Sequence, residues 1–396
     1  DKSNRLYYSQ ESFDDFYYGK GSTYPDINGG IGILFEQASS RGFQQNSING
    51  LLTFEYGIQN QVLTSLSTIQ GAWENKAQFQ TYRKNFYQES KKLIQKEKFN
   101  GYLLSEIKDS YRMDTFLNKL KAHQIDVLPL IEDFSYDGKE YKKEHSYYLP
   151  LAQKQYRLIQ ALFNQGTNFQ DNTFYDVSGW TMPLAMDINF KKVGRTRGLK
   201  LSKTTWQPTE KSPKTINHDA YAYAFEWHEF LAPRLLNQLL SKGIKAKVAT
   251  KTFSSIIDGV EKAFSTGTII LPTGIQTVES WQVIVEQAAN NNSLEIFNIA
   301  TGLTIKGVDI GSRSISQVEP IKVLLIGGKG TSQYEAAEIL FYLDDTLNIP
   351  VTVVEKNRLS RIKLNTYTHI IMVDGSYSDI DKKMVTSIKT WLKNGG

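Results

Sequence analysis

The chain of 396 residues contains no cysteine. That absence excludes disulfide bonds, thiolate metal sites and a cysteine nucleophile. No apolar run approaches the roughly 18 residues that a membrane-spanning helix needs, so the sequence predicts no membrane span. Histidine is scarce as well: there are five, and none of them begins a His-x-x-Glu motif. A zinc site built on that motif is therefore not expected within the chain.

An excess of charge of one sign is also lacking. Lys and Arg total 46 and Asp and Glu total 41, which leaves a formal net charge of +5. Because basic and acidic residues are interspersed, the sequence shows no nucleic-acid footprint. The densest basic stretch, residues 191–203, is interpreted as a solvated loop. The apolar and charged fractions of 40% and 22% are typical of a globular protein. The length predicts several domains.

A short apolar run near the start of the chain leads to a single carboxylate. Residues 29–37 read Gly-Gly-Ile-Gly-Ile-Leu-Phe-Glu-Gln. The apolar part predicts a buried strand over residues 31–35 that ends at Glu36. A carboxylate in that place is costly to bury unless it is paired or used. Taken alone, these residues favour the simpler interpretation that Glu36 marks the point where the strand reaches solvent.

An aromatic loop precedes this run. Residues 17–26 read Tyr-Tyr-Gly-Lys-Gly-Ser-Thr-Tyr-Pro-Asp. This loop and the Phe-Glu strand end together resemble the C-terminal part of the catalytic domain of zinc carboxypeptidases of the funnelin type. The resemblance covers roughly the first 95 residues. It implies that Glu36 is the catalytic glutamate, which takes a proton from the attacking water and delivers it to the departing amine.

The resemblance also assigns a pocket for the peptide substrate to the aromatic loop. Tyr17 or Tyr18 matches the tyrosine that closes over the substrate in that family. The spacing to Ser22 does not decide between Tyr17 and Tyr18, and Phe16, the residue before them, is a further alternative. Ser22 belongs to the Gly-Ser pair of the loop. Thr23 occupies the position that faces the side chain of the substrate's terminal residue, and because it is uncharged, no acidic or basic preference is implied.

Zinc is the cofactor that the resemblance implies. In that family a His-x-x-Glu pair and a distant histidine hold the metal, and all of them precede the glutamate. The five histidines here follow Glu36, so the ligands are expected upstream of Asp1 and no metal ligand is assigned within the chain. A local alternative would use His218 and His228 with neighbouring carboxylates. It is disfavoured because residues 221–225 alternate like a strand, which would separate the two histidines by roughly 33 Å.

Two later stretches share one order of predicted elements. Residues 99–218 and residues 219–318 each read as strand, helix, strand, strand, helix and strand, the split βαβ order of ferredoxin-like units. In both, a leucine-bearing helix precedes an isoleucine-led strand, and a Leu-Pro pair is expected to end a strand and open a helix. The pattern predicts an internal duplication, and the alternative is two unrelated α/β units.

The last 78 residues of the sequence, 319–396, read as a further unit. A buried strand over residues 321–326 precedes a glycine-rich turn and a helix. The following order of elements resembles the first half of the flavodoxin-type domain of class I glutamine amidotransferases. The catalytic cysteine of those domains comes later, and this chain has none, so that chemistry is not carried over. The domain is expected to be partial.

Together these patterns predict an α/β protein of several domains. Residues 1–98 are expected to be the C-terminal part of a zinc-carboxypeptidase domain, followed by ferredoxin-like units in 99–218 and 219–318 and a partial flavodoxin-like domain in 319–396. The predicted function is zinc-dependent hydrolysis of C-terminal residues from peptides, in the periplasm or outside the cell. The competing hypothesis is a non-catalytic binding or assembly module attached to a degenerate peptidase remnant.

Overall fold

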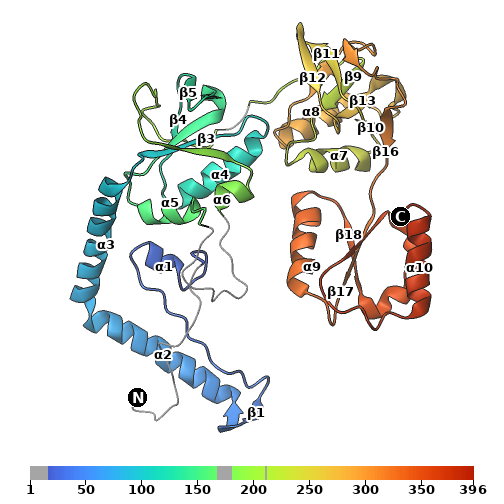
Figure 1. Cartoon of the computed structure of the whole chain (residues 1–396). Helices are drawn as coiled ribbons and strands as arrows, with labels where there is room; N and C mark the ends of the chain where they lie inside the picture. The colour runs from blue at the N-terminus through green and yellow to red at the C-terminus, as the bar shows by residue number, and fades with distance from the viewer. Residues whose placement is uncertain (1–16, 167–180, 210–211) are drawn as a thin grey trace. The chain divides into compact units, whose positions relative to one another are not determined.

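The computed structural model describes residues 17–166, 181–209 and 212–396. The chain divides into two compact parts, Asp1–Pro208 and Thr209–Gly396. Each part combines helices with β-sheets (Figure 1). The prediction of an α/β protein with several domains is confirmed at this level.

The first described residues form turns and one short helix, α1 (Tyr24–Ile27). Tyr18, Tyr24 and Ile27 pack against the apolar core of the sheet that follows. The predicted strand over residues 31–35 is wrong, because residues 31–40 lie in no helix or strand. A strand persists only where a neighbour satisfies its N–H and C=O groups. Within the described residues, no strand pairs with this segment.

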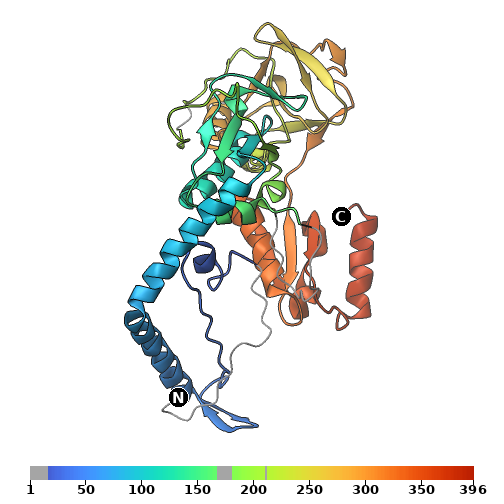
Figure 2. The same cartoon turned by 60° about the vertical axis from the view of Figure 1, so that its left-hand side comes forward.

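A hairpin and two long helices come next. They are β1 (Gln44–Ser47), β2 (Gly50–Thr53), α2 (Phe54–Glu74) and α3 (Lys76–Lys96). Thr53 caps α2 by accepting a hydrogen bond from the N–H of Tyr56. The two helices meet at an angle, as Figures 1 and 2 show. Asn75 is the one residue between them. The spacing of Val62, Leu66 and Ile69 in the sequence predicts a helix in this stretch. The hairpin was not predicted, because its exposed side chains give no alternation of apolar and polar residues.

The first α/β module comprises residues 101–193. Its elements are β3 (Gly101–Ser105), α4 (Ser110–Ala122), β4 (Leu128–Pro129), β5 (Phe134–Tyr136), β6 (Lys139–Tyr141), β7 (Ser146–Pro150), α5 (Tyr156–Leu162), α6 (Met182–Ala185) and β8 (Asn189–Val193). The strand order is β4-β7-β3-β8, and all neighbours are antiparallel. Helices α4 and α5 pack on one face of this sheet, and the β5–β6 hairpin packs on the other.

The second α/β module begins at residue 222. Its elements are β9 (Ala222–Phe225), α7 (Ala232–Ser241), β10 (Ala246–Ala249), β11 (Phe253–Ile257), β12 (Val260–Phe264), β13 (Ile269–Pro272), α8 (Trp281–Asn291), β14 (Phe297–Ile299), β15 (Lys306–Gly307) and β16 (Ile315–Val318). The main sheet is antiparallel in the order β14-β9-β13-β10-β16. Helices α7 and α8 pack on one face, and strands β11 and β12 pack on the other.

The two modules share strand order and register. The order β8-β3-β7-β4 in the first corresponds to β14-β9-β13-β10 in the second. Equivalent residue pairs are Tyr102–Leu149 and Gly101–Pro150 in the first module, and Tyr223–Leu271 and Ala222–Pro272 in the second. Each proline ends a strand, as predicted. Neither opens an α-helix, because α5 begins only at Tyr156 and α8 only at Trp281; Pro272 instead caps the short 3-10 helix η2 (Thr273–Ile275).

Each module also carries a hairpin on the second face of its sheet. In place of the single isoleucine-led strand predicted in each stretch, the structure has a short strand followed by a hairpin. The turns are Asp137-Gly138 and Asp258-Gly259, and all four residues have positive φ between 51° and 83°. Positive φ at both central residues is the requirement of a type I′ turn, for which Asp-Gly is a preferred sequence.

The C-terminal residues form a parallel sheet with the order β18-β17-β19. Its elements are β17 (Val323–Gly327), α9 (Gln333–Leu340), the π-helix η3 (Phe341–Thr346), β18 (Val351–Glu355), β19 (His369–Met372) and α10 (Lys382–Lys393). The loops after β17 and β19 are joined, since the N–H of Ser376 donates to the C=O of Gly330 at 2.9 Å. Strand β17 is buried throughout, as its apolar sequence predicted.

Candidate functional site

The aromatic loop is held by its own hydrogen bonds and by the core beneath it. Thr23 Oγ1 donates to the C=O of Tyr17 at 2.7 Å. The rings of Tyr17 and Tyr18 lie 5.4 Å apart, and Tyr18 packs against the core of the first α/β module. Burial, together with the neighbouring Tyr17, raises the pKa of Tyr18. The Tyr18 hydroxyl therefore keeps its proton at neutral pH and remains a hydrogen-bond donor.

Two tyrosine hydroxyls fix the short helix α1 that follows this loop. The hydroxyl of Tyr24 lies 2.6 Å from Nδ1 of His123, at the end of α4. Tyr87 of α3 donates to the C=O of Asn28 at 2.9 Å. A hollow of about 370 Å³ lies between the residues after α1 and helix α3, which contributes Tyr82 and Arg83 to its lining. The aromatic loop and α1 are thus held in place by these contacts, and a hollow lies next to them.

The loop is in close contact with the glycine run that leads to Glu36. A Cβ atom added to Gly32 would overlap the carbonyl oxygen of Ser22, so only glycine permits this approach. The N–H of Gly32 also donates to Oδ1 of Asp26 at 2.7 Å. The structure therefore brings Ser22 beside the segment that ends at Glu36.

Glu36 itself is exposed and lies outside any helix or strand. The preceding apolar residues are exposed too, with Leu34 at 66%. The following residue is anchored, because Oε1 of Gln37 accepts a hydrogen bond from Asn60 of α2 at 2.6 Å. In the described part of the chain, no hydrogen bond or ion pair joins the Glu36 carboxylate to another group. The tyrosines of the loop and the glutamate are not brought into contact.

The described residues do not provide a zinc site. No three histidine, aspartate or glutamate side chains among them are grouped so that they could hold a metal ion. Strand β9 separates His218 from His228, and His228 instead has its Nδ1 3.9 Å from Glu226. The zinc implied by the resemblance finds no ligand set here, so the residues present do not fit the metal by themselves.

Comparisons with known proteins leave the family open. No family model, no curated protein and no solved structure matches the chain. In the part of the chain that the structure describes, no helix combines the length and apolar character needed to cross a membrane.

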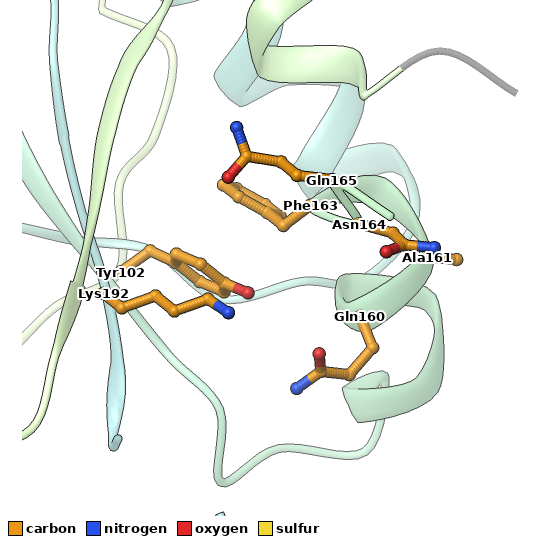
Figure 3. A pocket seen from close by; sticks show the side chains of 7 residues that line it. All are labelled: Tyr102, Gln160, Ala161, Phe163, Asn164, Gln165 and Lys192. Atoms are coloured by element: carbon orange, nitrogen blue, oxygen red, sulfur yellow. The ribbon is translucent and has the colours of Figure 1, made fainter. Parts of the chain in front are cut away.

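Sequence reasoning missed a second hollow, of about 300 Å³, in the first α/β module (Figure 3). Tyr102 of β3, Lys192 of β8, and Gln160, Phe163 and Asn164 at the end of α5 line it. The rings of Tyr102 and Phe163 stack with their centroids 4.2 Å apart. Burial, aided by a nearby carboxylate, raises the pKa of Tyr102 to about 12, so its hydroxyl remains a donor. No motif marks this hollow, because its residues meet only through strand pairing and helix packing.

Proposed function

We propose that this chain is the C-terminal portion of a zinc-dependent metallocarboxypeptidase, which removes C-terminal residues from peptides in the periplasm or outside the cell. One observation carries the proposal, namely the composition and exposure of α2. In the resembled family, helices that follow the glutamate strand close the catalytic domain. Helix α2 follows Glu36 in the sequence and has the composition of a helix that packs against another part of a protein.

Helix α2 contains no charged residue between positions 56 and 73. Large apolar side chains recur along it at spacings of three and four residues, which places them on one face. Each of them is between 50% and 77% exposed: Ile58, Val62, Leu66, Ile69 and Trp73. An apolar face of this length on a protein surface indicates a docking site.

The opposite face of α2 carries small residues, among them Gly57, Thr64, Thr68 and Gly71. Small residues let another element approach the helix backbone closely. Helix α2 thus has large apolar side chains on one side, small side chains on the other and no charge between positions 56 and 73. These properties suit a position between two layers of a domain. The proposed cover is the sheet of the catalytic domain.

In the proposed reaction the Glu36 carboxylate accepts a proton from the attacking water and passes it to the departing amine nitrogen. Tyr17 or Tyr18 closes over the peptide and donates a hydrogen bond to it, and Ser22 and Thr23 line the pocket for the terminal side chain. The zinc ligands are placed outside these 396 residues, so no step of the metal is derived from this chain.

The test uses the natural protein that contains this chain. Glu36→Gln keeps nearly the same volume but cannot accept the proton, so kcat is expected to fall by roughly 10²-fold to 10⁴-fold. Zinc content and the circular dichroism spectrum should stay unchanged. Glu55→Gln, at the start of α2, is the matched control and should retain activity. Near-native turnover in Glu36→Gln would remove Glu36 from the mechanism.

A second candidate function is a binding or assembly module. The observation that favours it is the shared strand order and register of the two α/β modules. We propose that both are ferredoxin-like units and that residues 319–396 are a partial flavodoxin-like domain related to class I glutamine amidotransferases. If the natural protein binds zinc at most weakly and cleaves no peptide with a free C-terminus, this second function is favoured over the first.

A further inference from the structure

The hollow in the first α/β module has a filled counterpart in the second. Tyr102 pairs directly with Lys192 across β3 and β8. Tyr223 pairs directly with Asn298 across β9 and β14. Because the two sheets share order and register, Tyr102 corresponds to Tyr223 and Lys192 corresponds to Asn298.

Two helical residues correspond in the same way. Gln160 lies in the last turn of α5 and Asn164 lies two residues beyond the helix, and both line the hollow. On α8 the equivalent pair is Glu286 and Asn290, also four residues apart. In both modules each member of the pair directly follows a buried apolar residue; these are Ile159 and Phe163 in the first module, and Val285 and Ala289 in the second.

In the second module, the two helical side chains bind the main chain of residues 214–217, which lie in no helix or strand. Oδ1 of Asn290 accepts from the N–H of Lys214 at 2.8 Å, and its Nδ2 donates to the C=O of Lys214 at 2.9 Å. Glu286 accepts from the N–H of Ile216 at 3.0 Å. The Ile216 side chain packs against the core.

The two strand residues bind the end of the same stretch. Asn298 accepts from the N–H of Asn217 at 3.0 Å, and the hydroxyl of Tyr223 donates to the C=O of Asn217 at 2.8 Å. All five hydrogen bonds go to main-chain groups. This arrangement therefore recognises a peptide backbone, largely independent of side-chain identity.

In the first module the preceding chain arrives differently. Helix α3 ends at Lys96, and the next residue, Glu97, accepts hydrogen bonds from Tyr156 at 2.6 Å and from Nε2 of Gln160 at 3.0 Å. These contacts leave Oε1 of Gln160 as an acceptor, the role that Glu286 has in the second module. The corresponding space is the hollow of Figure 3.

One difference between the modules changes what the hollow accepts. The side-chain oxygen of Asn298 accepts an N–H, whereas the ammonium group of Lys192 only donates. The Tyr102 hydroxyl and the Lys192 ammonium point in the same direction, toward the helix that carries Gln160 (Figure 3). The Lys192 ammonium and the Tyr102 hydroxyl are therefore two donors, one of them cationic. They match the two oxygens of a peptide's terminal carboxylate better than the main-chain N–H and C=O of a residue within a chain.

We propose that this hollow binds the C-terminal residues of an extended peptide. The terminal carboxylate accepts hydrogen bonds from Lys192 and Tyr102, and main-chain groups of the preceding residues bond to Gln160 and Asn164. The peptide is a separate molecule, held in the way that the second module holds residues 214–217. The site does not include Glu36, so it stands or falls independently of peptidase activity.

The probe is the acetylated tetrapeptide Lys-Thr-Ile-Asn, the sequence of residues 214–217, prepared with a free C-terminal carboxylate and as the C-terminal amide. Both are titrated into the 396-residue chain by calorimetry and followed by NMR signals of the side-chain amides. We expect the carboxylate form to bind about tenfold more tightly, as one charge-assisted hydrogen bond supplies. Lys192→Asn should remove this preference. Lys191→Gln, the adjacent residue on the other face of β8, should preserve it.

Equal affinity for the two peptides, or an unchanged preference in a folded Lys192→Asn variant, would overturn the proposal. Failure of both peptides to bind would overturn it as well. In that case, protected side-chain amides of Gln160 and Asn164 in the free chain would indicate that the chain itself fills the hollow.

Discussion

The side-chain amide of Gln153 bonds both main-chain groups of Asp126, since Oε1 accepts from the N–H at 2.8 Å and Nε2 donates to the C=O at 3.2 Å. Gln276 makes the same pair of bonds with Lys245, at 2.9 and 2.8 Å. Each glutamine also donates to the C=O of the proline that ends the preceding strand. Asp126 and Lys245 occupy equivalent positions, so this clamp occurs once in each module and supports their origin by duplication.

The clamp is expected to stabilise each module. Gln276→Ala removes three hydrogen bonds and should lower the free energy of unfolding by roughly 1–3 kcal/mol, because each bond contributes about 1 kcal/mol net. Urea unfolding measures the change. Gln287→Ala, at an exposed position of α8, is the control and should have little effect. Equal losses in the two variants would show that the clamp adds nothing specific.

The apolar face of α2 should govern how the isolated chain associates. Leu66→Gln removes an exposed apolar side chain from the middle of that face. We expect weaker binding of a hydrophobic dye and less self-association in sedimentation, with unfolding of the α/β modules unchanged. Ser67→Gln, outside the apolar face, is the control. An isolated chain that stays monomeric and binds no dye would show that α2 is already covered.

Buried tyrosines should make the first module sensitive to alkali. Burial raises the pKa values of Tyr102, Tyr147, Tyr148 and Tyr156 to about 12 from the usual 10.0. In the unfolded chain these groups lose their protons first, so their contribution is fully present below about pH 10 and is lost as the pH rises toward 12. Tyrosinate absorbance and circular dichroism, recorded together, should change in this window. Stability that is constant up to about pH 12 would contradict the prediction.

The C-terminal sheet should lose stability in acid. Nζ of Lys356, a nearly buried side chain, lies 2.9 Å from Oδ1 of Asp379. The hydrogen bond from Lys356 lowers the pKa of Asp379. Because the pKa of Asp379 is lower in the folded chain, the ion pair stabilises the fold at pH values above the usual aspartate pKa. This contribution is lost as the pH falls through the lowered pKa of Asp379. Asp379→Asn should flatten the acid limb of the stability curve, whereas Asp345→Asn should leave it unchanged.

Sequence reasoning succeeded where one periodicity is repeated within an element. The leucine-bearing helices predicted in the two modules are present as α4 and α7, and the buried strand predicted over residues 321–326 is present as β17, because both signals are local. It failed for residues 31–35, because a strand depends on a partner that the apolar pattern does not specify. The hollow lined by Tyr102 and Lys192 could not be predicted either. The two residues are neighbours because of the register between β3 and β8, and the sequence pattern does not specify that register.

The strand order that the two modules share over four strands has a consequence for biosynthesis. Each main sheet draws its paired strands from its own contiguous stretch of chain, so the first module has all its strands before the second is synthesised. Similar modules risk exchanging strands during folding. Cotranslational order reduces that risk, because the first module can close before a competing strand exists. Refolding of the whole chain from denaturant has no such order, and it should yield more misassembled protein than synthesis does.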